Sequence, residues 1–397
     1  MKRLVNKELQ RIQPSGIRSF SSLAAQTPGC LFLTIGEPDF NTPEEIKEAA
    51  KQALDRNEVH YPPWAGQRCL RERIARFEKE RNGVDYSADE VIFTDGATEA
   101  LYLALTGLLN EGDEVIIPTP AFGLYRAIVE LAKGVVVPLP TEDPDFQIEE
   151  GMLRDCLSPR TKAIVLNSPN NPTGAVYSQE TLEMIRRVLA GTGENQDEGE
   201  RPQWGPVFVI CDDVYAQISY GECRSFSQFQ DMKKQIIVVQ SFSKPYAMTG
   251  WRAGYLLAHE AIASQLLKLH ANMVVSAVSF IQRACAAALD YDPRGMIRAY
   301  HRRRDYVCQR LMEMGLELNQ PQGAFYAFPS IKKYGLDSKS FCLKMVEEER
   351  LAVVPGTYFG ADDHVRISYC YGDETLEEGL NRLERFVSRL KRMEKID

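Results

Sequence analysis

The feature that most constrains the fold is a series of seven short apolar segments along the middle of the chain. Each is rich in Val and Ile, and helical segments or loops separate one from the next. They lie at 90–94, 114–118, 135–139, 162–167, 206–211, 236–240 and 254–258. Strands that are apolar along nearly their whole length are typical of sheets covered on both faces. The series therefore predicts an α/β fold with a mostly parallel, seven-stranded sheet.

The length of 397 residues exceeds what one simple core accommodates, so we predict two domains. The large domain, which contains the sheet, is expected at 46–286. A long helical region is expected at about 260–290, after the last strand. The remainder mixes charged helices with short strands. We expect 1–45 and 287–397 to build a smaller α+β domain from both ends of the chain.

Composition and short motifs exclude several classes of function. The formal net charge of −8 argues against a nucleic-acid or membrane-surface role. No apolar run reaches the roughly 20 residues of a membrane helix, and we expect no signal peptide because no apolar segment follows the basic N-terminus. Gly191-Thr-Gly193 lacks the third glycine and the preceding strand of a dinucleotide-binding turn. We interpret 191–205 as an exposed polar loop.

Cysteine and histidine usage indicates a cytoplasmic protein without a metal site. The nine cysteines are an odd number and include no Cys-x-x-Cys pair. We therefore expect reduced and mostly buried thiols. The five histidines show no metal-ligand spacing, so neither a structural nor a catalytic metal is expected.

A lysine follows closely after the apolar strand 236–240. Open α/β sheets bind ligands in the crevice beyond the carboxyl ends of their strands, and Lys244 falls at that place. The hydroxyl side chains of Ser241 and Ser243 lie beside it in the sequence, and Arg252 adds a fixed cation suited to phosphate. A Schiff-base enzyme that uses pyridoxal phosphate (PLP) requires such an amine nucleophile beside an anion site.

Two further strand ends carry groups suited to a cofactor. Strand 90–94 runs into a glycine turn with Ala97 and Thr98 that opens a helix. The free N–H groups and the positive end of the helix dipole would bind an anion there, although the turn could also be only a capped helix. Strand 114–118 ends shortly before Phe122, whose ring either joins the core or stacks on a cofactor.

Polar side chains also follow the next two strands. Strand 162–167 ends in a turn with two prolines and a glycine that fixes the place of Asn171. The following strand ends in Asp212, Asp213 and Tyr215. Carboxylates that close a buried strand need a cation or a donor. The protonated nitrogen of a pyridine ring would satisfy Asp212.

Together these segments resemble the class I and II aminotransferases of PLP fold type I. The resemblance runs from Gly36 to Arg366, and the stretch from Ser241 to Gly254 matches the lysine signature of the family. The family usually has glutamate where this chain has Asp213. The sequences Gly-Glu-Pro-Asp-Phe, Met-Thr-Gly-Trp-Arg and Gly-Ala-Phe-Tyr resemble the prokaryotic branch of aspartate, aromatic and N-acetyl-diaminopimelate aminotransferases.

The resemblance implies a role for each residue at the strand ends. Lys244 is expected to bind PLP covalently and to move protons during catalysis, with Asp212 on the pyridine nitrogen and Tyr215 near the phenolic oxygen. The other contacts to PLP are expected from Ala97, Thr98, Phe122, Asn171, Ser241, Ser243 and Arg252. Substrate contacts are expected from Gly36, Asn171 and Arg366, the last on the α-carboxylate. Tyr61 is expected to reach the phosphate in the neighbouring subunit of a homodimer.

The implied reaction is a ping-pong transamination. An acidic or aromatic L-amino acid gives its amino group to a 2-oxo acid such as 2-oxoglutarate. A PLP-dependent carbon–sulfur β-lyase or a decarboxylase would use the same cofactor residues, so both stay open as alternatives. We do not expect a PLP-binding regulator, which would carry an added DNA-binding domain. The incomplete glycine motif disfavours a nicotinamide oxidoreductase.

Overall fold

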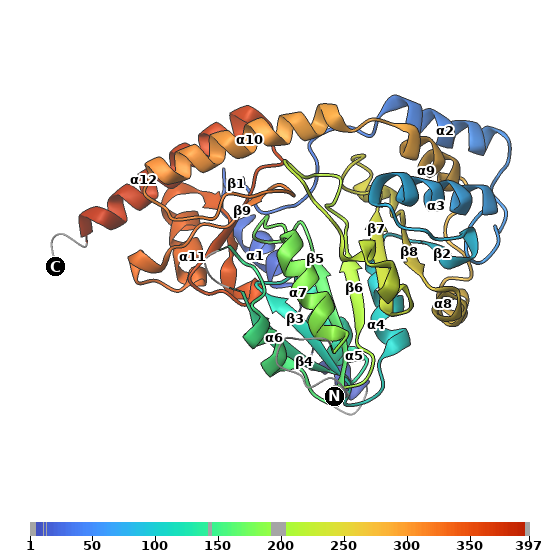
Figure 1. The fold of residues 1–397 in the computed structure, drawn as a ribbon. Coiled ribbons are helices and arrows are strands. Elements are labelled where there is room, and N and C mark those ends of the chain that lie inside the picture. The colour runs from blue at the N-terminus through green and yellow to red at the C-terminus, as the bar shows by residue number, and fades with distance from the viewer. Residues whose placement is uncertain (1–4, 11, 13, 142–144, 192–203, 394–397) are drawn as a thin grey trace.

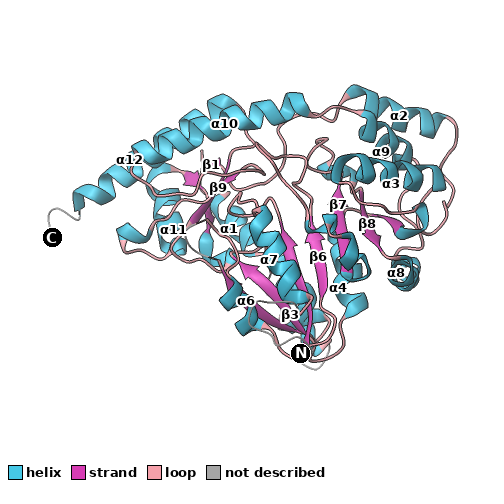
Figure 2. Cartoon of the chain, viewed as in Figure 1, coloured by secondary structure: helices cyan, strands magenta, loops and turns pink. Residues whose placement is uncertain are grey.

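A computed structural model describes the chain except for residues 1–4, 11, 13, 142–144, 192–203 and 394–397. Its centre is a seven-stranded sheet with helices on both faces (Figures 1 and 2). In spatial order the strands are β2 (Val91–Thr94), β8 (Gly254–Ala258), β7 (Ile236–Ser241), β6 (Phe208–Asp212), β5 (Thr161–Asn167), β3 (Glu114–Thr119) and β4 (Val135–Pro140). All seven predicted strands are therefore present, close to their expected bounds.

The directions of the strands determine where a ligand can bind. Strands β4, β3, β5, β6 and β7 run parallel, so their carboxyl ends meet at one edge of the sheet. Strand β8 runs antiparallel to both of its neighbours. The segment 242–253 between β7 and β8 contains no α-helix to cross over the sheet, so the chain returns directly beside β7. The prediction of a mostly parallel α/β sheet is confirmed.

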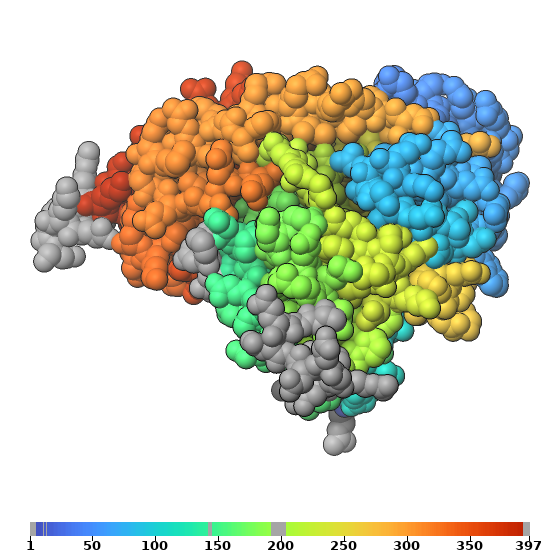
Figure 3. Space-filling model, viewed as in Figure 1, coloured from blue at the N-terminus to red at the C-terminus, as the bar shows by residue number. Residues whose placement is uncertain are grey.

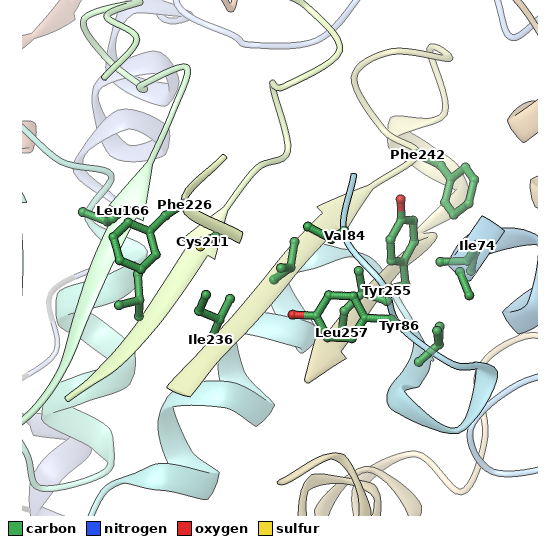
Figure 4. Packing of buried hydrophobic residues seen from close by; sticks show 14 of the residues in the cluster. Ile74, Val84, Tyr86, Leu166, Cys211, Phe226, Ile236, Phe242, Tyr255 and Leu257 are labelled. Carbon is green, nitrogen blue, oxygen red and sulfur yellow. The ribbon is translucent and has the colours of Figure 1, made fainter. Parts of the chain in front are cut away.

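Two hydrophobic clusters cover the two faces of the sheet, because successive strand residues point to opposite sides. Leu256 joins one cluster and Leu257 the other. The first cluster includes α4 (Ala97–Leu108), α5 (Leu124–Leu131) and α8 (Glu260–Met273). The second includes α2 (Glu44–Asp55), α3 (Arg68–Asn82), α6 (Glu150–Cys156), α7 (Gln179–Leu189) and α9 (Ile281–Asp290). Figure 4 shows part of this second cluster, with Phe242, Tyr255 and Leu257 near Ile74.

The helical region expected at about 260–290 is present and consists of two helices with a break between them. Helices α8 and α9 are separated by 274–280, whose sequence is Val-Val-Ser-Ala-Val-Ser-Phe. β-Branched and hydroxyl residues are weak helix formers, and Val275 has a left-handed φ of 67°. The high alanine and leucine content of both helices hid this break in the sequence.

A further hydrophobic cluster lies beside the sheet and joins both ends of the chain. Strand β1 (Leu31–Phe32) pairs in parallel with β10 (Leu351–Ala352). Strand β12 (Val365–Ser368) lies between β11 (Val354–Pro355) and β9 (Tyr326–Ala327) and is antiparallel to both. The helices of this region are α1 (Gly16–Ala24), α10 (Arg294–Glu313), α11 (Ser338–Glu349) and α12 (Asp373–Met393).

The C-terminal region forms the orange and red part of the molecule in Figures 1 and 3, and Figure 1 shows it beside the sheet. We propose that it is a separate small domain built from 1–45 and 287–397, next to a large domain at 46–286. The pairing of β1 with β10 supports this proposal, since it ties the N-terminal segment to the C-terminal one. The proposed boundary after residue 286 falls inside α9.

No helix among the described residues combines the length and apolarity needed to cross a membrane. The polar loop expected at 191–205 lies largely outside the described residues, which resume at Trp204. The cytoplasmic location stays a prediction.

Candidate active site

A cavity of about 590 Å³ lies beyond the carboxyl ends of the parallel strands. Its wall combines strand ends of the sheet with the segment 34–37, the helix α1, and residues of β9 and β12. The cavity brings together nearly all the predicted site residues. These are Gly36, Ala97, Thr98, Phe122, Asn171, Asp212, Tyr215, Ser241, Ser243, Lys244, Arg252 and Arg366.

Lys244 lies in the turn after β7, and its side chain enters the cavity. The Nζ amine donates a hydrogen bond of 2.7 Å to the carbonyl oxygen of Gly36. Burial lowers the pKa of this amine to about 8. A lysine with such a pKa is neutral far more often near pH 7 than an ordinary lysine, which suits a nucleophile or a general base.

Asp212 ends β6 and is 3% exposed. The Tyr125 hydroxyl donates to its Oδ2 at 2.5 Å, and the N–H of Val214 donates to Oδ1 at 3.4 Å. Burial raises the pKa of the Asp212 carboxyl to about 6, against the effect of these donors and of Lys244. The group is thus a buried acid that faces the cavity and would gain from a cationic partner there.

Asp213 follows directly but does not line the cavity. Burial raises the pKa of its carboxyl to about 8, so this acid is mostly protonated near pH 7. Asp213 lies just past the end of β6, and of the two acids it is Asp212 that lines the cavity.

The glycine turn in which an anion site is expected opens helix α4. Gly96 precedes the helix with a φ of 87°, a conformation that glycine adopts without strain. The guanidinium of Arg252 packs directly over this turn, because a Cβ at Gly96 would lie 2.6 Å from its Nη2. The N–H of Ser243 donates to the Ser241 hydroxyl at 3.0 Å on the facing turn. The helix dipole, the free N–H groups and the guanidinium are together suited to an anion, and this arrangement is called the cradle below.

Arg366 lies on β12, in the C-terminal region, and its side chain lines the cavity. It is 3% exposed. Its Nη1 donates to the Asn171 Oδ1, and its Nη2 donates to the carbonyl oxygen of Thr34, each at 2.7 Å. The guanidinium carbon lies 4.4 Å from the centre of the Tyr326 ring. Five N–H groups belong to a guanidinium, so N–H groups remain free for an anionic ligand, and the Nε has no hydrogen-bond partner among the described residues.

Close packing around Gly36 joins the two sides of the cavity. A Cβ at this position would lie 1.9 Å from the hydroxyl oxygen of Tyr326, so a larger residue would displace that ring. The Tyr326 hydroxyl is in turn 2.7 Å from the hydroxyl of Tyr215. Gly36 therefore allows the backbone, the amine of Lys244 and the two phenols to approach one another.

Tyr61 is the one predicted site residue that the cavity does not include. Its side chain is 85% exposed, beside the exposed Trp64 and Val59. Within a single chain it touches nothing at the site, so its expected role depends on a second subunit.

Tyr125 and Arg18 are two of the cavity residues that the sequence analysis did not predict. Tyr125 donates to Asp212 from the first turn of α5, and its sequence signal was its place three residues after Phe122, beyond the same strand end. Arg18 is an exposed arginine of α1 that lines the cavity. No local pattern marks it, because the approach of α1 to the strand ends is set by long-range packing.

Comparison with known proteins gives the family. The sequence model of the family "Aminotransferase class I and II" matches residues 28–383. A probable N-acetyl-LL-diaminopimelate aminotransferase of Bacillus subtilis is 39% identical over 98% of this chain and 96% of its own. Aromatic-amino-acid aminotransferase 2 of Thermococcus litoralis is 38% identical over 98% of this chain and 99% of its own.

A comparison with solved structures supports the same family. The aspartate aminotransferase from Thermus thermophilus, solved with maleate, superposes with a TM-score of 0.89 at 33% identity, over 96% of this chain and 99% of that one. The predicted resemblance and the type I fold are confirmed, and nothing in these comparisons favours a lyase. The chain belongs to the class I and II aminotransferases and is an aminotransferase.

Proposed function

We propose that this aminotransferase binds PLP in the cavity and moves the amino group of an acidic or aromatic L-amino acid to a 2-oxo acid such as 2-oxoglutarate. The observation that carries the proposal is the meeting of an amine, an anion cradle and a buried carboxylate in one space. The relatives named for aspartate and aromatic amino acids support the choice of donors.

The residues of the cavity fit PLP. The cradle at Gly96 and Arg252 would hold its phosphate, and the amine of Lys244 would bond to its aldehyde carbon. Asp212 is a buried acid that a protonated pyridine nitrogen would satisfy. The remaining predicted contacts are the ring of Phe122 and the polar groups of Asn171 and Tyr215. Bound PLP supplies an electron sink for the carbanion that forms when the substrate loses its α-proton.

The protein's own groups then bind and orient the substrate and move its proton. Arg366 would hold the α-carboxylate, which places the α-carbon near Lys244. The neutral amine of Lys244 would take the α-proton and return it as general acid and base. The amine's lowered pKa of about 8 keeps both protonation states accessible near neutral pH.

A panel of amino donors with 2-oxoglutarate tests the function and separates it from the lyase alternative. We expect acidic and aromatic donors to give stoichiometric glutamate and new 2-oxo acid, with no ammonia. Release of ammonia without matching amino transfer would contradict the proposal and favour a lyase. A preference for small neutral donors would contradict the proposed specificity.

We predict that Arg366→Lys damages substrate binding almost as strongly as Arg366→Ala. A point-charge ammonium cannot reproduce the planar fork that contacts a carboxylate with two N–H groups. Losing such a pair in a desolvated pocket costs about 2–5 kcal/mol. The KM for every donor, measured in the first half-reaction, should therefore rise by at least about tenfold.

Arg18→Ala is the matched variant for this prediction, since Arg18 lines the same cavity from α1. We propose that Arg18 contacts the distal carboxylate of acidic substrates. Its loss should then raise the KM for aspartate and leave that for an aromatic donor unchanged. A wild-type KM for Arg366→Lys on all donors would reject the α-carboxylate clamp, and an equal effect of Arg18→Ala on both donor classes would reject its distal role.

We also propose that the active unit is a homodimer in which Tyr61 completes the site of the partner subunit. The exposure of Tyr61, Trp64 and Val59 supports this, because large apolar surfaces of this kind suit an interface. We predict that mixed dimers of Tyr61→Phe and Lys244→Ala subunits recover activity. One site of each mixed dimer carries both substitutions and the other site carries neither. A fully active monomer in solution would contradict the prediction.

A further inference from the structure

A buried pair of titratable side chains lies behind the anion cradle and has no part in the mechanism above. Glu99, in the first turn of α4, is 8% exposed, and His270, in the last turn of α8, is 0% exposed. The Oε1 of Glu99 and the Nδ1 of His270 are 2.7 Å apart. Neither residue lines the cavity, so the pair does not belong to its wall.

The other carboxylate oxygen of Glu99 holds the turn from which the cradle is made. Its Oε2 accepts a hydrogen bond of 2.5 Å from the N–H of Asp95. Asp95 immediately precedes Gly96, and the next peptide units supply the free N–H groups at the start of α4. A charged acceptor on the Asp95 N–H therefore fixes the direction in which those N–H groups point.

His270 holds Glu99 in its turn. Helix α8 packs against α4, and its histidine is the donor that reaches Glu99 Oε1 from a second element. The Nε2 of His270 has no hydrogen-bond partner among the described residues, so it is through Nδ1, to Glu99, that the ring makes its polar contact there. Without the imidazole, one oxygen of a buried carboxylate would lose its donor, and the side chain would reorient toward solvent or other donors.

We propose that His270 and Glu99 are positioning residues for the phosphate group of the cofactor. The pair ties α8 to the Asp95–Thr98 turn and so sets the affinity of the cradle for phosphate. This inference rests on the proposed use of PLP. The effect is greatest when the cofactor carries the amino group, because it is then no longer bonded to Lys244 and only noncovalent contacts retain it. The pair thus keeps the aminated cofactor in place between the two half-reactions.

Pyridoxamine phosphate is the probe for this inference, because it cannot bond to Lys244 and reports the noncovalent contacts alone. Its dissociation constant is measured by titration of the full-length, cofactor-free protein, beside that of pyridoxamine, which lacks the phosphate. We expect His270→Ala to raise the dissociation constant of pyridoxamine phosphate by about tenfold or more, as when a hydrogen bond to a charged group is lost. Pyridoxamine should bind His270→Ala as it binds the wild type.

Three further variants distinguish positioning from loss of packing. Glu99→Gln removes the charge and should also weaken the binding of pyridoxamine phosphate. His270→Asn keeps an N–H donor near the Nδ1 position and should retain most of the wild-type affinity. Leu266→Ala is the matched control, since Leu266 is a buried residue of α8 that packs on Gly107 of α4, away from the turn. It should leave the ratio of the two dissociation constants unchanged.

The outcomes separate this inference from the proposed function. If His270→Ala and Glu99→Gln bind pyridoxamine phosphate within twofold of a wild type that binds it well, the positioning role is wrong and PLP use stands. Equal weakening of both probes, or an equal effect of Leu266→Ala, would also overturn the positioning role. A wild type that binds neither PLP nor pyridoxamine phosphate would overturn the proposed function, and this inference with it.

Discussion

Lys244→Ala should abolish transamination while leaving the protein folded and able to bind PLP. The substitution removes the nucleophile and the general base at once, so kcat should fall by about 10⁴-fold or more, the scale reported when a covalent nucleophile is lost. The cradle at Gly96 and Arg252 is untouched by the change. Absorbance of the bound cofactor and steady-state rates measure the two effects separately.

Lys233→Ala is the matched control for this prediction. Lys233 is another partly buried amine, paired with Glu90, but it lies outside the cavity. Its removal should leave kcat near the wild-type value. Borohydride reduction of the wild-type protein loaded with PLP, followed by peptide mapping, should place the cofactor on Lys244. A label on another lysine would contradict the assignment.

Most of the sheet could be predicted from sequence because a strand covered on both faces is apolar along its length. That signal found all seven strands, but it contains no information on their spatial order. The antiparallel direction of β8 follows from the segment 242–253, which is occupied by the turn with Lys244 and has no crossover helix. The break between α8 and α9 was missed because the valines and serines at 274–280 lie between two strongly helical sequences.

The site was predictable to the extent that parallel strands bring their carboxyl ends together. This rule, with the family resemblance, placed Lys244, Asp212 and the cradle in one cavity. It could not find Arg18, because the position of α1 depends on packing between distant parts of the chain. The family resemblance also assigned a phosphate contact to Tyr61. That role needs a second subunit and stays a prediction. Local sequence thus predicts the residues at the strand ends, whereas the other cavity residues depend on contacts between distant parts of the chain.

The two neighbouring acids at the end of β6 lead to the last prediction. They share a sequence context but differ in surroundings, since Asp212 faces the cavity and Asp213 does not. In the cofactor-free protein burial raises the pKa of Asp212 to about 6, and that of Asp213 to about 8. At pH 7 Asp212 is therefore mostly ionised and able to hold a pyridine nitrogen protonated, whereas Asp213 is mostly neutral.

We predict that Asp212→Asn keeps the fold but lowers kcat by about 10²–10⁴-fold, because a neutral amide cannot stabilise the protonated ring nitrogen. Asp213→Asn is the matched control. An amide closely replaces a carboxyl that is already protonated, so its kcat and its stability at pH 7 should stay near those of the wild type. Tyr125→Phe removes one donor to Asp212 and should give a smaller loss. If Asp212→Asn turned over within a few-fold of the wild type, or Asp213→Asn lost as much activity, the assignment of the pyridine partner to Asp212 would be wrong.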